Sequence, residues 1–321
     1  MHITANAACD KNPIVGTICG MSESEPADAN RQHGANSSRR FLFDDADIRG
    51  EIVALDSSYR DILAIHQYAP GVGRVLGEFL AASVLLSTTL KFEGKLILQV
   101  RSSGQIPLLM AECNHELHIR GIARGAQEAT ALSNDQLLTD GQLAITIDPT
   151  QGQRYQGIVP LESDCLAHSL DAYFQQSEQL GTRFWLAADG QHARGLLLQQ
   201  LPADVTGDAA QREEQWNHAC ALASTVGDEE LLQVDLVSLL HRLYHQDSVR
   251  LFDPRDVAFR CNCSRQRTRN ALATLDPAEV GELLQELGVI TMDCEFCNQQ
   301  YRFDESDLAD VLGDAGSKTL H

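Results

Sequence analysis

The chain has 321 residues, and 25 Lys and Arg stand against 45 Asp and Glu, a formal net charge of −20 at pH 7. A surface this acidic repels phosphate backbones, so we expect no nucleic acid among its partners. Hydrophobic residues make up 43% of the chain, which excludes wholesale disorder and allows two or three domains. The first twenty residues lack a continuous apolar stretch, and the longest nearly apolar run, Phe79 to Leu90, is interrupted by Ser and Thr. We therefore expect a cytoplasmic chain without a membrane-spanning segment.

The N-terminal part divides into a tail and a core. Residues 1–38 are rich in small, polar and acidic residues without an apolar period, which predicts a disordered tail. In residues 39–201, strand and helix periods alternate, which predicts an α/β core domain in a chain of the α+β class. Strands are expected at 49–55, 95–100, 117–123, 142–147, 155–161, 183–187 and 195–201. Helices are expected at 77–90 and at 164–180, where one apolar face would carry Leu166, Leu170, Tyr173 and Phe174.

Residues 202–250 are expected to form a helical linker. The pattern looks helical from 208 to 246, and Asp228 is a plausible N-cap. A leucine stripe follows the helical period, formed by Leu231, Leu232, Leu236, Leu239, Leu240 and Leu243. Such a stripe usually packs on a neighbouring domain, but it could also be a surface that is covered in one state and exposed in another. The stripe alone does not decide between these alternatives.

Residues 251–321 are predicted to form a small zinc-binding domain. Cys261 and Cys263 are followed, after thirty residues, by Cys294 and Cys297. Four thiolates close a tetrahedral Zn²⁺ site and leave no open position for a catalytic water. We therefore expect one Zn²⁺ per chain at these four cysteines; whether it only stabilises the module or also senses oxidants is a separate question. No catalytic site is visible in the sequence, so we expect no enzymatic activity.

The same module contains a well-delimited helix. Asp276 is expected as its N-cap, Pro277 as its first residue and Gly288 as its stop. A second short helix is expected at about 305–312. The chain thus places a short, capped helix between the two cysteine pairs.

Five further cysteines are scattered singly, and the absence of a signal peptide argues against a disulfide scaffold. Cys9 and Cys19 in the tail are expected to be exposed bystander thiols rather than extra redox sites, and the sequence does not assign a role to Cys113, Cys165 or Cys220. Residues 113–118 lack the two histidines four residues apart that a zinc protease motif requires, and the glycines of 71–77 lack dinucleotide-binding spacing.

Four arginines crowd the first cysteine pair, at positions 260, 265, 267 and 269. Their positive charge would stabilise thiolates, the form that peroxide and hypochlorous acid attack, which favours a redox-sensing site. Alternatively they balance the charge of −2 that four thiolates and Zn²⁺ leave. Both interpretations remain open.

The sequence around the cysteines resembles the zinc switch of the 33 kDa chaperonins, the redox-regulated heat-shock holdases. The resemblance rests on Asp253-Pro254, Val257-Ala258-Phe259-Arg260-Cys261-Asn262-Cys263-Ser264-Arg265, Met292-Asp293-Cys294-Glu295-Phe296-Cys297 and Tyr301-Arg302-Phe303. It extends over roughly residues 40–310, through Arg49-Gly50-Glu51, Thr89-Leu90-Lys91-Phe92-Glu93-Gly94, Arg154-Tyr155-Gln156-Gly157, Ser177-Glu178-Gln179-Leu180 and Leu240-His241-Arg242-Leu243-Tyr244-His245. The departures are Gln266 for Glu, Asn298 for Gly, and the N-terminal tail.

The resemblance implies an ATP-independent chaperone that is inactive while reduced and zinc-bound. Oxidation would pair Cys261 with Cys263 and Cys294 with Cys297, release zinc and unfold the C-terminal module. The linker would then loosen, and the protein would form a homodimer and hold unfolded or partly unfolded client proteins. The leucine stripe, losing its cover, is the expected client-binding surface.

Two other functions remain to be weighed. A thiol-disulfide oxidoreductase would use the C-terminal cysteine pairs, although its C-x-x-C normally opens a helix after a strand. A zinc-ribbon module that binds nucleic acid is possible locally, but residues 252–321 hold 7 Arg and Lys against 13 Asp and Glu.

Overall fold

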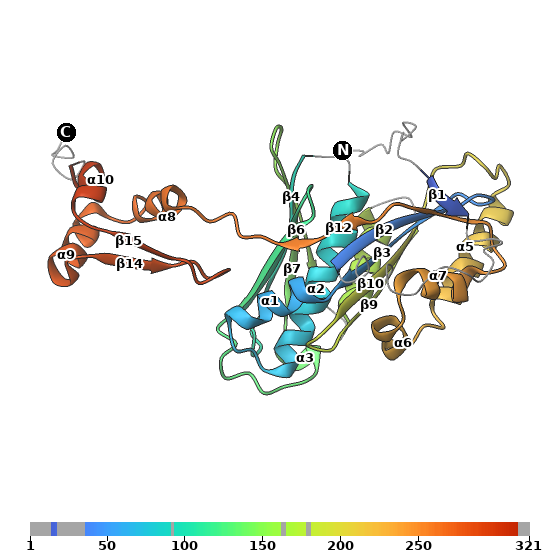
Figure 1. The fold of residues 1–321 in the computed structure, drawn as a ribbon, viewed down its shortest axis with the longest axis horizontal. Coiled ribbons are helices and arrows are strands. Elements are labelled where there is room, and N and C mark those ends of the chain that lie inside the picture. The colour runs from blue at the N-terminus through green and yellow to red at the C-terminus, as the bar shows by residue number, and fades with distance from the viewer. Residues whose placement is uncertain (1–13, 18–35, 91–92, 162–164, 178–180, 314–321) are drawn as a thin grey trace. The chain divides into compact units, whose positions relative to one another are not determined.

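The computed structural model describes residues 14–17, 36–90, 93–161, 165–177 and 181–313, so most of the expected tail lies outside the described residues. The chain divides into two compact units, Met1–Phe259 and Arg260–His321 (Figure 1). The first unit includes the expected linker, and it also takes residues 251–259 from the module expected to begin at 251. Asn36 to Ser38 lie in a strand rather than in a disordered tail.

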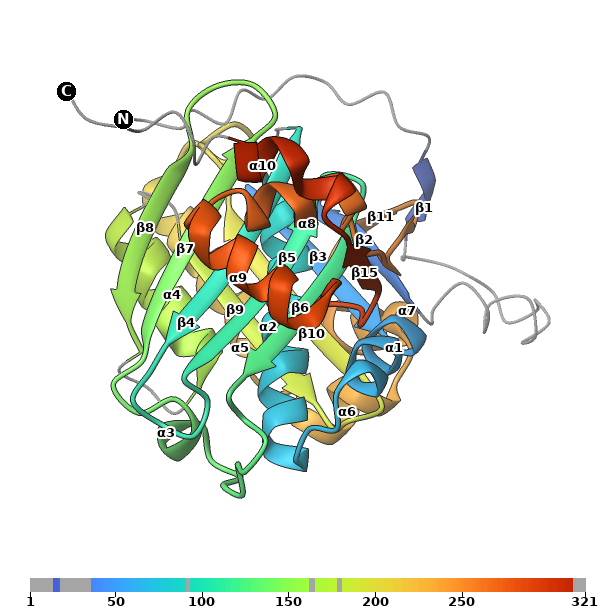
Figure 2. The ribbon, with the colours of Figure 1, turned by 90° about the vertical axis from the view of Figure 1, so that its left-hand side faces the viewer.

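Two sheets form the frame of the first unit. Sheet A has the order β1 (Ile14–Thr17), β11 (Val249–Phe252), β2 (Asn36–Phe43), β3 (Ile48–Leu55), β10 (Ala193–Gln200) and β9 (Thr182–Ala188), and β12 (Arg255–Asp256) pairs with β2. Sheet B has the order β13 (Ala258–Phe259), β6 (His118–Arg124), β5 (Leu108–Asn114), β4 (Gly94–Arg101), β7 (Gln142–Pro149) and β8 (Tyr155–Pro160). Figure 2 shows β8, β7, β4, β5 and β6 side by side. Neighbouring strands are antiparallel, except that β13 runs parallel to β6.

Helix α2 (Pro70–Thr89) lies between the two sheets and contacts β3, β9 and β10 on one side and β4, β5 and β6 on the other. It begins seven residues earlier than expected, because Pro70 stands at its N-terminus, where a missing N–H costs no hydrogen bond. Over the described residues, α2 is the one helix long and apolar enough to cross a membrane, and 89% of its apolar window is buried inside the protein. Its apolar character is therefore that of a core helix.

Three shorter helices complete the layer between the sheets: α1 (Ser57–Ile65), α3 (Asn134–Leu137) and α4 (Leu166–Ser177). The expected apolar face of α4 is confirmed, since Leu166, Leu170 and Tyr173 are buried and Phe174 packs against the same cluster. α4 begins at Leu166, and residues 164 and 178–180 of the expected helix lie outside the described residues.

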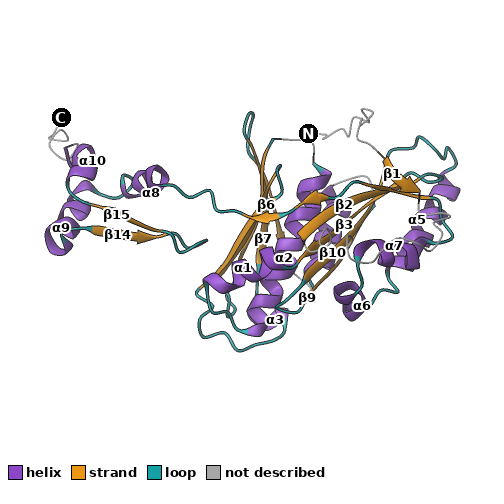
Figure 3. Ribbon diagram, viewed as in Figure 1, coloured by secondary structure: helices purple, strands orange, loops and turns teal. Residues whose placement is uncertain are grey.

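The linker, expected to be helical from 208 to 246 with an N-cap at Asp228, forms three helices: α5 (Ala209–Ala223), α6 (Asp228–Gln233) and α7 (Leu236–Tyr244). Asp228 is the first residue of α6 and Gly227 its N-cap, so the predicted cap was displaced by one position. The helices cover the face of sheet A opposite α2 (Figure 3). Alternate residues of β10 separate the two layers, since Leu197 faces α2 whereas Leu196 and Leu198 face the linker helices.

The second unit is small. It comprises α8 (Arg265–Leu272), α9 (Pro277–Leu287), the hairpin of β14 (Ile290–Asp293) and β15 (Gln300–Phe303), and a short helical end, η1 (Ser306–Leu308) with α10 (Ala309–Gly313). The expected caps of α9 are confirmed: the side chain of Asp276 accepts a hydrogen bond from Ala278 N at 2.8 Å, and Gly288 has a φ of 71°. The buried apolar cluster of the second unit consists of Leu272, Val280, Leu284, Ile290, Phe303, Leu308 and Val311.

Candidate metal centre

The four cysteines of the C-terminal unit converge on one point. Their Sγ atoms all lie within 4.8 Å of one another; Cys261 lies 3.6 Å from Cys294 and Cys263 lies 3.4 Å from Cys297. Within the described residues, these four form the single group of three or more His, Cys, Asp or Glu side chains that is close enough to hold a metal ion. In a tetrahedral site with Zn–S distances of about 2.3 Å, the sulfurs lie about 3.8 Å from one another, so the arrangement of the four Sγ atoms fits a tetrahedrally coordinated metal ion.

Two short turns present the sulfurs. Cys294 follows β14, and its carbonyl accepts hydrogen bonds from Cys297 N at 3.2 Å and Asn298 N at 2.7 Å, which folds the chain into a tight turn before β15. Asn298 has a φ of 55°, in the left-handed region that Asn tolerates better than most residues. On the other side, Ser264 caps α8 directly after Cys263, accepting a hydrogen bond from Arg267 N at 3.2 Å.

The electrostatics of the cluster call for a cation. Burial is the largest cause that raises the pKa of Cys294 and of Cys297, because it disfavours the thiolate; Cys261 acts in the same direction on both, whereas backbone N–H groups act against it. Burial acts in the same direction on Cys263, but hydrogen bonds from the Tyr301 hydroxyl, at 3.1 Å, and from nearby thiols lower its pKa. Four neighbouring thiolates are therefore stable only around a positive ion, which a divalent metal supplies.

Three of the four arginines beside the first cysteine pair have structural partners. Arg265 donates to Asp307 at 2.7 Å and lies over the ring of Phe303. Arg269 pairs with Asp310, and Arg267 donates to Asn262 O at 2.8 Å between the two cysteines. Arg265 and Arg269 thus attach the C-terminal helical end to α8, a role that the sequence did not reveal.

The leucine stripe lies in the first unit. Leu231, Leu236, Leu239, Leu240 and Leu243 are buried, and Leu232 is partly buried against the same cluster. Their cover is sheet A itself.

Polar contacts also hold the linker. Asp47 is buried beside sheet A, pairs with Arg212 of α5, and accepts a hydrogen bond from Val205 N at 2.8 Å. Tyr244, at the end of α7, is fully buried and packs edge-on against Phe43 with ring centroids 4.9 Å apart. The sequence contained Tyr244 in a family motif but gave no sign of this position.

Three of the remaining cysteines lie among the described residues of the first unit. Cys113 is fully buried in β5, and burial raises its pKa to about 12, which makes it unreactive. Cys165 and Cys220 line one cavity of about 370 Å³ between α4, β9 and the linker helices. Cys9 and Cys19 lie outside the described residues.

Comparison with known proteins supplies the context. The family model described as Hsp33 protein matches residues 36–304. The chain belongs to the Hsp33 family. It is 53% identical over 287 residues to the 33 kDa chaperonin of Pseudomonas paraeruginosa, covering 88% of this chain and 97% of that protein. It is also 53% identical over 282 residues to the 33 kDa chaperonin of Azotobacter vinelandii, covering 87% and 95% respectively.

The fold of this Hsp33 protein is shared with a solved structure. The crystal structure of the 33 kDa chaperonin from Thermotoga maritima aligns with a TM-score of 0.73 at 20% identity, covering 88% of this chain and all of that one. The α+β fold class is confirmed, and family membership supports a chaperone function. The cysteine cluster is compatible with a zinc-binding domain.

Proposed function

We propose that this Hsp33 protein is a redox-regulated, ATP-independent holdase that binds unfolding proteins under oxidative stress in the cytoplasm. The observation that supports it most is the convergence of Cys261, Cys263, Cys294 and Cys297 in a unit with only a small apolar cluster. One Zn²⁺ per chain fits these sulfurs and contributes about 10–16 kcal/mol in comparable small modules. That exceeds the stability of most small domains, so loss of the ion unfolds the module.

Oxidation provides the trigger. In each pair, Cys261 with Cys263 and Cys294 with Cys297, two thiols lose two electrons and two protons and form one disulfide, while hydrogen peroxide is reduced to two waters. A disulfide no longer offers thiolates to a metal, so the reduced state favours the folded module and the oxidised state favours the open one. The proximity of all four sulfurs is compatible with this pairing.

Client binding requires apolar surface, and the leucine stripe provides it only when α6 and α7 leave sheet A. Their departure would expose the stripe together with the sheet residues that cover it, such as Phe41 and Leu196. Exposed apolar surface binds unfolded chains without directional contacts. We propose that activation also produces a homodimer, since the same surfaces can pair between copies, and that neither nucleic acid nor a membrane is a partner.

The geometry favours a holdase over a thiol-disulfide oxidoreductase. Cys294 and Cys297 lie in a hairpin turn rather than at the start of a helix, and a second cysteine pair faces them. We therefore propose no enzymatic activity.

One experiment tests the proposal on a single sample. Zinc content, free thiols and suppression of the aggregation of a thermally unfolding client are measured before and after treatment with hydrogen peroxide or hypochlorous acid. We expect zinc release and suppression to appear together, and reductant with zinc to reverse both. The variant with Cys113, Cys165 and Cys220 replaced by Ala should behave in the same way. Suppression that is equal in the reduced, zinc-loaded protein, or insulin reduction by the cysteine pairs, would contradict the proposal.

A further inference from the structure

Residues 255–259, here called the crossing segment, pass from one sheet of the first unit to the other. β12 pairs with β2 of sheet A, and β13 pairs in parallel with β6 of sheet B. Val257 alone separates the two strands. The metal ligand Cys261 follows two residues after β13. The segment therefore joins both sheets directly before the second unit, which contains the metal ligands, begins at Arg260.

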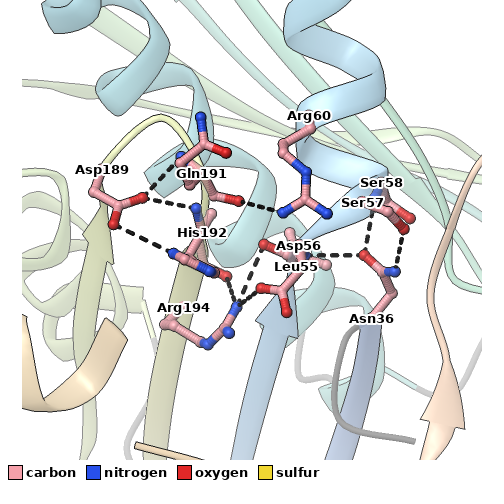
Figure 4. Close-up of polar contacts among 11 residues, drawn as sticks. Asn36, Leu55, Asp56, Ser57, Ser58, Arg60, Asp189, Gln191, His192 and Arg194 are labelled. Atoms are coloured by element: carbon pink, nitrogen blue, oxygen red, sulfur yellow. Dashed lines mark hydrogen bonds and ion pairs between the residues drawn. The ribbon is translucent and has the colours of Figure 1, made fainter. Parts of the chain in front are cut away.

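A few specific contacts hold the crossing segment. Val257 is 3% exposed within the buried cluster between the sheets, and its N–H donates to Asn36 O at 2.9 Å. The buried hydroxyl of Ser58 donates to Val257 O and accepts from Phe259 N, each at 3.3 Å. Figure 4 shows the layer beneath, where the Asn36 side chain accepts from Ser58 N at 2.9 Å and donates to the Ser57 hydroxyl at 2.6 Å.

The crossing segment also closes an edge of sheet B. The carbonyl of Leu117 accepts from Ala258 N at 3.2 Å, and further along the same edge Ala123 N donates to the Tyr68 hydroxyl at 3.1 Å. An open edge pairs readily with another extended chain. Val257 and Phe259, two residues apart on one strand face, both pack against the cluster between the sheets. The site thus accepts an extended peptide with apolar side chains at alternate positions.

We propose that the crossing segment occupies, within its own chain, a strand-addition site for clients. When it leaves, the edge of β6 binds an extended stretch of an unfolding polypeptide in parallel, with an aliphatic side chain in the place of Val257 and a second apolar one in the place of Phe259. This inference rests on the proposed function. The C-terminal end of the crossing segment leads into the second unit, which the proposed activation unfolds, and on its N-terminal side β11 connects it to the linker helices.

A labelled peptide with the sequence of residues 253–259 tests the site in the full-length protein. We expect it to bind the oxidised form at least about tenfold more tightly than the reduced form and to compete with an unfolding client. The same peptide with Val257→Asp should bind at least about tenfold more weakly, because a carboxylate would enter an apolar slot. Three outcomes would overturn the inference. The two peptides could bind equally well, or the wild-type peptide could bind the two redox forms equally well. The peptide could also dissociate a dimer of the protein without displacing the client.

Two neighbouring serines provide matched variants. Ser58→Ala removes the hydroxyl that holds two backbone groups of the crossing segment, so amide exchange at Val257 and Phe259 should accelerate by about tenfold in the reduced protein. Ser57→Ala removes a hydroxyl that, among these groups, contacts only the Asn36 side chain, so amide exchange at Val257 and Phe259 should match that of the wild type. Equal exchange in both variants would overturn the inference. If oxidised protein suppresses aggregation while the crossing segment stays protected, the inference fails alone; if it suppresses none, the proposed function fails.

Discussion

The two units of this protein are held together by different means. The first unit buries a 20-residue helix between two sheets and adds a second apolar layer under the linker helices. The second unit has one small apolar cluster and four thiols that require a cation to be ionised together. Apolar burial is indifferent to oxidants, whereas thiolate ligation is abolished by them.

That difference shows how one chain can combine a durable part and a conditional part. A domain of the size of the first unit buries enough surface to fold alone, and one of about sixty residues is marginal without a metal. The linker helices belong structurally to the durable part, since sheet A covers them. Activation must therefore overcome apolar and polar contacts within the first unit, beyond the unfolding of the second. Four predictions probe this contrast, in order of decreasing effect.

Removing one metal ligand should unfold the second unit and leave the first intact. In Cys297→Ser, the loss of a closed site forfeits much of the roughly 10–16 kcal/mol that structural zinc contributes. Hydrogen exchange under reducing conditions should show rapid exchange throughout 260–313 and unchanged protection in α2. Cys220→Ser is the control and should keep full zinc content. A folded second unit in metal-free Cys297→Ser would show that its apolar cluster suffices.

Tyr244→Ala should loosen the linker helices from sheet A. The phenol packs against Phe41 and Phe43 and its hydroxyl donates to Ala219 O at 3.2 Å, so truncation leaves a cavity and removes that hydrogen bond. We expect a loss of about 3 kcal/mol or more in unfolding free energy. Exchange in 208–246 should rise, and some suppression of client aggregation should appear in reductant. The exposed neighbour His245→Ala should match the wild type; if Tyr244→Ala does so too, other contacts hold the linker.

Asp47→Asn should weaken the same attachment in a pH-dependent way. Burial opposes the charge of Asp47, but backbone N–H groups of Asp204, Val205 and Thr206 together with Arg212 lower its pKa below the ordinary value. Its contribution is therefore present above about pH 3.9 and is lost as the pH falls through the lower folded pKa.

Urea unfolding should show a loss of about 2 kcal/mol for Asp47→Asn at pH 7, with the two proteins converging in strong acid. The exposed Asp45→Asn serves as the control and should lose little at either pH. If the difference in unfolding free energy between Asp47→Asn and wild type stays constant from pH 7 to strong acid, the charge of the Asp47 carboxylate does not stabilise the linker attachment.

Asn298→Gly should slightly stabilise the turn between Cys297 and β15. A left-handed φ suits glycine, which has no Cβ, so we expect a gain of about 0.5 kcal/mol. Competition with a zinc chelator measures it as a modest increase in metal affinity. Asn262→Gly, at a ligand turn without a positive φ, should weaken affinity instead. The opposite order would mean that the Asn298 side chain itself stabilises the turn.

Local features of the site could be predicted from the sequence. The four cysteines, the caps of α9 and the apolar face of α4 all depend on residues close in the chain, whose spacing determines which side chains share a face or a turn. Segments without a periodic signal were missed, including α1, β5 and the β14–β15 hairpin. β11 pairs with β2 over three residues and β13 pairs with β6 over two, and segments this short show no periodic pattern in the sequence.

Contacts between distant residues were decided only by the tertiary structure. The sequence by itself determined that a leucine stripe exists and that four thiols can close a metal site, because periodicity and ligand spacing are local properties. It could not determine that sheet A covers the stripe, that Asp47 binds Arg212, or that Ala258 pairs with His118. Each of these depends on which surfaces meet when the whole chain packs, and burial of apolar area selects a partner without a specific sequence signal.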